Sequence, residues 1–147
     1  MNVAVIIPAL NEQDCIADTI ARIPGGLAAQ LLVVDNGSTD ATAERARQAG
    51  AKVVSEGRRG YGQACLTGLG QVRPEIDVVA FLDADGCDDP AELRRLLEPI
   101  ATGEADLVIG SRTAGDARKH LTPQQRFGNA LACALIQVGW GDRKSVV

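Results

Sequence analysis

Short apolar runs rich in β-branched residues alternate along this chain with segments whose apolar residues recur at helical spacing. Runs of this length, each followed by a polar loop, are typical of strands buried in a parallel sheet. Alternation of strand and helix implies right-handed crossovers, with helices on both faces of the sheet. The sequence therefore predicts an α/β fold with a mostly parallel sheet. The five predicted strands are residues 3–7, 31–34, 52–55, 78–82 and 107–109.

Capping residues and helix breakers place the helices between these strands. Asn11 is predicted to cap a helix from Glu12 to about Ile23, and Ser38 or Thr39 to cap one that closes at Gly50. A glycine-rich loop over 57–62 leads into a helix through residue 69. Two further helices are predicted after the cap-then-proline pairs Asp89-Pro90 and Thr122-Pro123, the last of them running to about Val138.

Composition excludes several classes of protein. A chain of 147 residues suits one domain with a real core. The net charge of −4 offers no basic face, so we expect no nucleic-acid partner. No apolar stretch is long enough to span a bilayer, and no signal peptide is recognisable. The four cysteines are widely spaced, which argues against a zinc site or a disulfide scaffold and favours a reducing cytoplasm. Cys15, Cys65 and Cys133 are expected to be small buried side chains, whereas Cys87 lies beside the aspartate pair.

The pair Asp83-Ala84-Asp85 follows the fourth predicted strand directly. Carboxylates at the carboxyl ends of parallel strands line the crevice in which open α/β sheets bind ligands. Such hard oxygen ligands suit Mg²⁺ or Mn²⁺, which is usually shared with substrate phosphates. The alternative is an Asp/Gly turn that merely ends the strand, and the pattern alone leaves both interpretations open.

Five motifs now stand in order, each at the carboxyl end of a predicted strand. They are residues 7–12 (IPALNE), 33–40 (VVDNGSTD), 60–64 (GYGQA), 83–85 (DAD) and 107–112 (LVIGSR). This series resembles family 2 glycosyltransferases of the GT-A fold, especially the branch of dolichyl- and polyprenyl-phosphate sugar synthases. The resemblance covers residues 3 to about 138 and implies a Rossmann-like nucleotide-sugar-binding fold.

The resemblance also implies roles for individual residues. Asp83 and Asp85 would hold Mg²⁺ or Mn²⁺ on the diphosphate of the donor, with Ala84 between them and Arg112 adding charge at the phosphates. Asp35 would accept hydrogen bonds from the base or ribose, or else would serve as a turn residue bonded to the backbone N–H groups of residues 36–38. The base-and-ribose pocket would be lined by Pro8, Leu10 and Glu12, with Leu10 standing where family members often carry an aromatic side chain.

Two glycines of the motif at residues 60–64 have a simpler explanation than phosphate binding. Gly60 and Gly62 are expected to allow a tight turn or a close approach of helix and strand.

The implied function is transfer of a sugar from a UDP- or GDP-linked donor to an acceptor, with a polyprenyl phosphate as one candidate. One alternative is a non-catalytic nucleotide-sugar-binding fragment. Another is a phosphatase of the haloacid-dehalogenase type, in which Asp83 would be phosphorylated. That family carries its nucleophile on the first strand, whereas Asp83 follows the fourth, so we disfavour it.

The family pattern stops after the helix that would precede the acceptor half, and no catalytic base is assigned. We therefore expect residues 1–141 to form an incomplete GT-A domain, truncated before the acceptor half. Residues 142–147 fit no element and are expected to be a non-native or disordered tail. The parent protein is expected in the cytoplasm or at the cytoplasmic face of a membrane.

Overall fold

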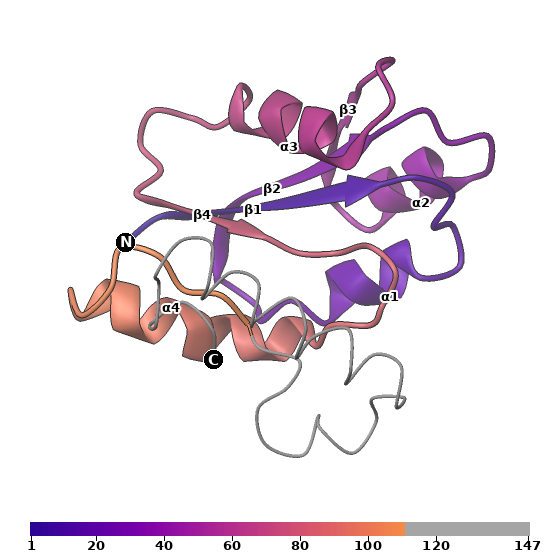
Figure 1. Ribbon diagram of the computed structural model, residues 1–147. Coiled ribbons are helices and arrows are strands. Elements are labelled where there is room, and N and C mark those ends of the chain that lie inside the picture. The colour runs from indigo at the N-terminus through magenta and orange to yellow at the C-terminus, as the bar shows by residue number, and fades with distance from the viewer. Residues whose placement is uncertain (111–147) are drawn as a thin grey trace, which may run out of the picture. The chain divides into compact units, whose positions relative to one another are not determined.

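Four parallel strands pair into one sheet, in the order β3-β2-β1-β4, within the part of the chain that the structure describes (Figure 1). The structure is a computed structural model, and it describes residues 1–110. Strand β1 pairs with β2 on one side and with β4 on the other, both in parallel. The mostly parallel sheet is thus confirmed. The strands are β1 (Val3–Ala9), β2 (Ala28–Asp35), β3 (Lys52–Ser55) and β4 (Val78–Phe81).

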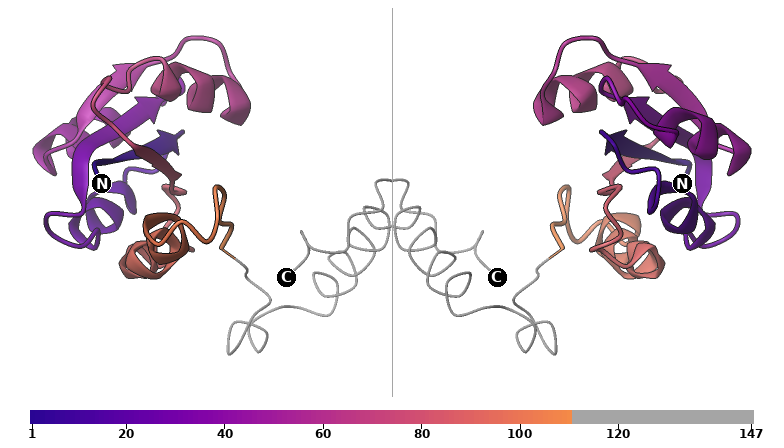
Figure 2. Two further views of the ribbon diagram at one scale, coloured as in Figure 1. Left: turned by 90° about the vertical axis from the view of Figure 1, so that its left-hand side faces the viewer. Right: turned by 90° about the vertical axis from the view of Figure 1, so that its right-hand side faces the viewer.

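Helices cover both faces of this sheet, as predicted (Figures 1 and 2). Because successive side chains of a strand point to opposite faces, β1 serves two apolar clusters. Val5 and Ile7 pack with residues of α1, α2 and α4, whereas Ile6 packs with Ala64 of α3 on the other face. The helices are α1 (Ile16–Ala21), α2 (Thr42–Gln48), α3 (Tyr61–Leu69) and α4 (Leu93–Ala101), with the 3₁₀ turn η1 (Pro90–Glu92) before α4.

Two of the predicted helix starts are wrong by several residues. Asn11 does not cap a helix: it has a φ of 57°, and its Oδ1 accepts a hydrogen bond from the N–H of Thr39 at 2.8 Å. Turns follow it, and α1 begins only at Ile16. Helix α2 begins at Thr42, whose N–H is accepted by Asp40 Oδ1 at 2.9 Å, rather than after Ser38 or Thr39. In both cases the predicted capping residue bonds a neighbouring loop instead of its own helix: Asn11 accepts from Thr39, and Ser38 Oγ accepts from the N–H of Asn11.

The helix signals at Asp89-Pro90 and at Gly50 are confirmed. Asp89 Oδ1 accepts the N–H of Ala91 at 3.1 Å, with Pro90 at the first position of η1. Gly50 follows α2 with a φ of 94°, a conformation that favours glycine.

The predicted fifth strand is absent at residues 107–109, which have no regular secondary structure. The side chain of Leu107 is 76% exposed. Strand β4, predicted to be buried, is instead an edge strand of the described sheet, and Phe81 at its end is 43% exposed. A short apolar run forms a strand only where a neighbouring strand accepts and donates hydrogen bonds to its backbone N–H and C=O groups. Residues 107–109 form no such pairing with β4, which pairs with β1.

Several predictions fall on residues that the structure does not describe. Arg112, the helix from Thr122 to Val138 and the boundary at residue 141 all lie outside residues 1–110. Within the described residues, no helix combines the length and the apolar character that crossing a membrane requires. Cys15 and Cys65 are less buried than predicted, since both are half-buried free thiols. Cys87, beside the aspartate pair, is exposed.

Helix α3 lies very close to the sheet, and a glycine permits this. A Cβ atom placed on Gly68 would lie 2.6 Å from Cγ2 of Ile6 and 3.1 Å from Cγ2 of Val34. The close approach expected of Gly60 or Gly62 is therefore made by Gly68, one residue before the end of the helix. Gly62 has no neighbour within 4 Å of such a Cβ.

This difference makes a matched pair of substitutions in one helix. We expect Gly68→Ala to destabilise the protein by about 1–3 kcal/mol, because the added methyl group forces Ile6 and Val34 out of place. Gly62→Ala meets open space and should be neutral or stabilising by up to about 1 kcal/mol. Urea unfolding followed by circular dichroism measures both. Equal effects of the two substitutions would contradict the close packing of α3 on β1.

Candidate functional site

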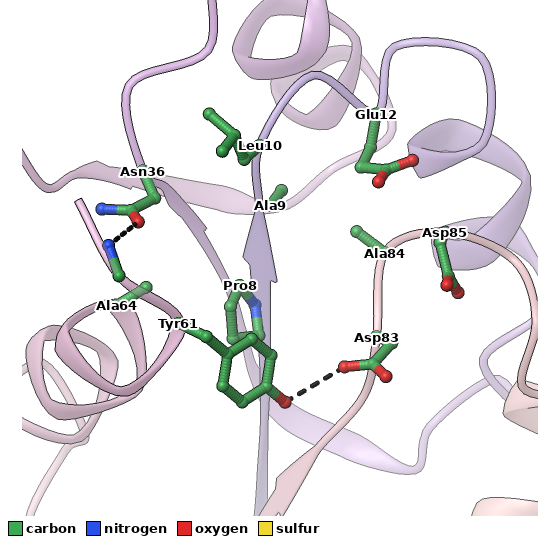
Figure 3. Close-up of a pocket in the computed structure, with 11 residues that line it drawn as sticks. Pro8, Ala9, Leu10, Glu12, Asn36, Tyr61, Ala64, Asp83, Ala84 and Asp85 are labelled. Atoms are coloured by element: carbon green, nitrogen blue, oxygen red, sulfur yellow. Dashed lines mark hydrogen bonds between the residues drawn. The ribbon is translucent and has the colours of Figure 1, made fainter.

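A pocket of about 350 Å³ opens at the carboxyl edge of the sheet (Figure 3). It takes residues from the ends of β1 and β2, from the start of α3 and from the segment after β4. Six residues predicted from the motifs line it together: Pro8, Leu10, Glu12, Asp83, Ala84 and Asp85. Ala9, Asn36, Gly60, Tyr61 and Ala64 also line it and were not predicted as site residues.

The two aspartates after β4 both reach this pocket, and the intervening Ala84 is buried. Asp85 Oδ1 accepts the N–H of Cys87 at 2.9 Å, and Gly86 has a φ of 74°. The turn interpretation of this motif is therefore correct. It is also compatible with a ligand site, because the same turn leaves both carboxylates lining the pocket.

Glu12 adds a third acid to the pocket lining. Burial, and then the negative charges of Asp85 and Asp40, raise the pKa of Glu12 above its usual range. The carboxylates of this pocket thus repel one another, which is a situation that a cation relieves. No three His, Cys, Asp or Glu side chains of residues 1–110 are arranged to hold a metal by themselves. A cation here would need further oxygen ligands from a substrate or from water.

Asn36 is the first site residue that sequence reasoning missed. It is only 5% exposed, and its Oδ1 accepts the N–H of Gly60 at 2.8 Å. Its Nδ2 donates to the carbonyl oxygens of Arg58 at 2.7 Å and Glu56 at 3.2 Å. Asn36 therefore ties the end of β2 to the glycine-rich loop. Gly60, with a φ of 137°, makes the tight turn expected of it.

Tyr61 is the second missed residue, although it is the only tyrosine of the chain and stands between two glycines. Its ring lines the pocket, and its hydroxyl donates a hydrogen bond to Asp83 Oδ1 at 3.0 Å (Figure 3). Loss of solvent around the hydroxyl, and then the hydrogen bond to the Asp83 carboxylate, raise the pKa of Tyr61 to about 12. The hydroxyl therefore keeps its proton and acts as a donor at neutral pH.

Asp35 ends β2 but is not among the residues that line the pocket. Its Oδ1 accepts the N–H of Ser38 at 3.1 Å, as the turn alternative predicted. Its contact with a base or ribose stays a prediction.

Glu56 does not line the pocket, but it holds together elements that do. Its side chain, 11% exposed, accepts hydrogen bonds from the N–H of Arg58 at 2.7 Å, from Gln63 at 3.1 Å and from the hydroxyl of Thr67. The hydroxyl of Thr67, followed by the N–H of Arg58, lowers the pKa of Glu56 to about 2. One carboxylate thus holds the end of β3, the glycine-rich loop and α3 together.

Comparison with known proteins identifies the family. The family model described as glycosyl transferase family 2 matches residues 4–143. The chain belongs to glycosyl transferase family 2. This assignment decides against the phosphatase alternative, and the pocket described above is the candidate donor site of a family 2 glycosyltransferase.

The relatives include proteins of known and unknown activity. An uncharacterized glycosyltransferase of Mycobacterium tuberculosis is 44% identical over 110 residues, which are 75% of this chain and 48% of that protein. Glucosyl-3-phosphoglycerate synthase of Mycolicibacterium smegmatis is 39% identical over 112 residues, 68% of this chain and 36% of the relative. The chain thus spans about half the length, or less, of these relatives.

A solved structure shares the fold. Glucosyl-3-phosphoglycerate synthase from Mycobacterium tuberculosis, in complex with Mn²⁺, UDP and glucosyl-3-phosphoglycerate, is 35% identical and has a TM-score of 0.62. The similarity covers 70% of this chain and 40% of that chain. The Rossmann-like GT-A fold expected from the resemblance is confirmed, whereas the branch of dolichyl- and polyprenyl-phosphate sugar synthases is not singled out.

The ionised Glu56 gives a prediction on acid stability. Because its pKa is lowered from 4.5 to about 2 on folding, its contribution to stability is present in full above pH 4.5. That contribution is lost as the pH falls from there towards 2. Glu56→Gln should therefore lower the urea midpoint clearly at pH 7, and the difference from wild type should shrink between pH 5 and pH 3.

The exposed Glu104 offers a control with the same change of charge. Glu104→Gln should leave the urea midpoint nearly unchanged at each pH. A deficit of Glu56→Gln that stayed constant from pH 7 to pH 3 would show that the ionised form of Glu56 does not hold the loop.

Proposed function

We propose that this chain binds a nucleotide-diphosphate sugar together with Mg²⁺ or Mn²⁺ in the pocket at the carboxyl edge of the sheet. The observation that carries the proposal is the convergence of Asp83 and Asp85 with the Pro8-to-Glu12 segment on one pocket. In the whole protein the bound donor would pass its sugar to an acceptor. Support comes from the family and from the solved relative that holds Mn²⁺ and UDP.

The acids of the pocket fit a divalent cation. Asp83 and Asp85 supply hard carboxylate oxygens, and Glu12 adds negative charge beside them. Two protein carboxylates suffice when phosphate oxygens of the substrate complete the coordination. When bound, the cation would neutralise negative charge on the departing nucleoside diphosphate.

The remaining lining suits the nucleoside. Pro8, Leu10 and Ala64 present apolar surface against which a base and ribose would pack. Asp35 is proposed to accept a hydrogen bond from the base or ribose, since its carboxylate has a second oxygen besides the one bonded to Ser38. Arg112 is proposed to meet the phosphates. UDP is the first nucleotide to test, because it is the one bound in the solved relative.

For the acceptor we propose a molecule that carries a phosphate group. The resemblance in the motifs favours a polyprenyl phosphate, which would bring the whole protein to a membrane surface. The relative that is a glucosyl-3-phosphoglycerate synthase favours a small phosphorylated acid instead. Residues 1–141 are proposed to form the nucleotide-sugar-binding domain, and residues 142–147 to lie outside it.

Metal-dependent nucleotide binding is the first test. UDP with Mn²⁺ should raise the melting temperature, because a ligand that binds only the folded state stabilises it by about 2.7 kcal/mol at a hundred times its Kd. Asp85→Asn should abolish the metal-dependent part of this shift, and Asp83→Asn should weaken it. Asp18→Asn, on the surface of α1, is the control and should leave it unchanged. Equal shifts with and without Mn²⁺ would contradict a metal site at the aspartates.

Transfer is the second test, and its arms separate the acceptors. The 147-residue chain is incubated with radiolabelled UDP-glucose or GDP-mannose, Mn²⁺, and either a polyprenyl phosphate or 3-phosphoglycerate. Label that moves into the organic-solvent phase supports the polyprenyl phosphate. Label that appears in a water-soluble, anionic glycoside shows instead that 3-phosphoglycerate is the acceptor and overturns the polyprenyl phosphate. Donor binding without any transfer would support the non-catalytic, nucleotide-sugar-binding alternative for this chain.

A further inference from the structure

We propose that Tyr61 is a positioning residue for the metal: its hydroxyl holds the Asp83 carboxylate in the orientation in which that carboxylate binds the divalent cation. The inference rests on the proposed function of the pocket. It concerns a residue outside the predicted metal and nucleotide ligands, and it assigns that residue a role distinct from contact with the donor.

The backbone at Tyr61 is held at its amino end. Gly60 makes the turn into α3 with a φ of 137°, and its N–H is fixed by Asn36 Oδ1 at 2.8 Å. Asn36 is buried and is bonded through its Nδ2 to the same loop. The backbone from which the Tyr61 ring projects is therefore fixed at the edge of the pocket, and the side chain, 59% exposed, is held there by its hydroxyl bond to Asp83.

The helix that carries Tyr61 is held along the rest of its length. Gly68 lets α3 approach Ile6 and Val34 so closely that a single methyl group would clash. Glu56 bonds both Gln63 and Thr67 of the same helix. Tyr61 therefore projects from a rigid element, which is the kind of support that precise ligand geometry requires.

The hydroxyl of Tyr61 joins two walls of the pocket. Tyr61 and Asp83 are 22 residues apart in sequence, on α3 and on the segment after β4, and their side chains point toward one another across the pocket (Figure 3). A hydrogen bond from a remote, rigid donor selects one rotamer of the carboxylate. Metal-ligating carboxylates are commonly fixed by such an outer partner.

Asp85 is held differently, and this makes the effect separable. Its Oδ1 is bonded to the N–H of Cys87 within its own turn, so Asp85 does not depend on α3 for that contact. Removing the Tyr61 hydroxyl should therefore disturb Asp83 and leave the Asp85 turn bond in place.

The experiment compares wild type with Tyr61→Phe, which keeps the ring and removes the hydroxyl. Binding of Mn²⁺ in the presence of saturating UDP is followed by electron paramagnetic resonance of the free ion, and UDP affinity without metal is measured by calorimetry in EDTA. We expect Tyr61→Phe to raise the Kd of Mn²⁺ by about tenfold, as loss of an outer partner commonly does. The metal-free UDP affinity and the melting temperature should stay at the wild-type values.

A double-mutant cycle isolates the partner of Tyr61. In the Asp83→Asn background, Tyr61→Phe should weaken Mn²⁺ binding no further, because the carboxylate that the hydroxyl orients is already gone. In the Asp18→Asn background, the tenfold loss should persist.

The outcomes distinguish this inference from the proposed function. Wild type that shows no Mn²⁺-dependent UDP binding would overturn both. Wild-type binding that Tyr61→Phe retains in full would overturn the positioning role alone. Equal loss of UDP affinity with and without metal would also overturn it, since Tyr61 would then contact the nucleotide directly.

Discussion

Pairing of β1 with both β2 and β4 is the interaction on which the rest of the structure depends. All seven residues of β1 are buried, so the strand cannot shift without losing two ladders and the apolar packing of both faces. Because all the pairings are parallel, the carboxyl ends of the strands meet at one edge. The register places Ala9 beside Asp35 and Ile6 beside Phe81. The segments that follow these residues supply the walls of the pocket, so the site is a direct consequence of the ladder.

Hydrogen bonds between loops then fix what the ladder brings together. Asn11 accepts from the N–H of Thr39, and its own N–H donates to Ser38 Oγ at 3.0 Å. The N–H of Glu12 donates to Thr42 Oγ1 at 2.8 Å. These bonds hold the loop after β1 against the loop after β2. Asn11 adopts its positive φ because it links the two loops, instead of capping a helix as expected. A pocket wall held in this way needs little reordering on binding, which favours affinity.

The sequence predicted those features that follow from local patterns. Apolar runs and helix breakers located the four strands of the described residues, and the acidic pair marked the correct edge. What it missed depends on contacts between distant residues. Asn36 and Tyr61 stand within two of the motifs, but they belong to the pocket through bonds to residues at least 20 positions away, which motif spacing does not indicate. The strand expected at residues 107–109 failed for the opposite reason: its local pattern was suitable, but a strand exists only through a partner, and β4 does not pair with it.

The acidic lining carries a consequence for the order of events at the proposed donor site. Burial and the charge of Asp85 raise the pKa of Glu12, and a nucleoside diphosphate without a cation would add further negative charge beside these acids. A divalent cation bound between them would attract both the carboxylates of the pocket and the diphosphate, and so would offset their mutual repulsion. Each ligand should then raise the affinity of the other by the same factor, because the coupling free energy is shared. At the proposed donor site, the repulsion among the acids would lower the affinity for the bare nucleotide and favour binding of the metal–nucleotide pair.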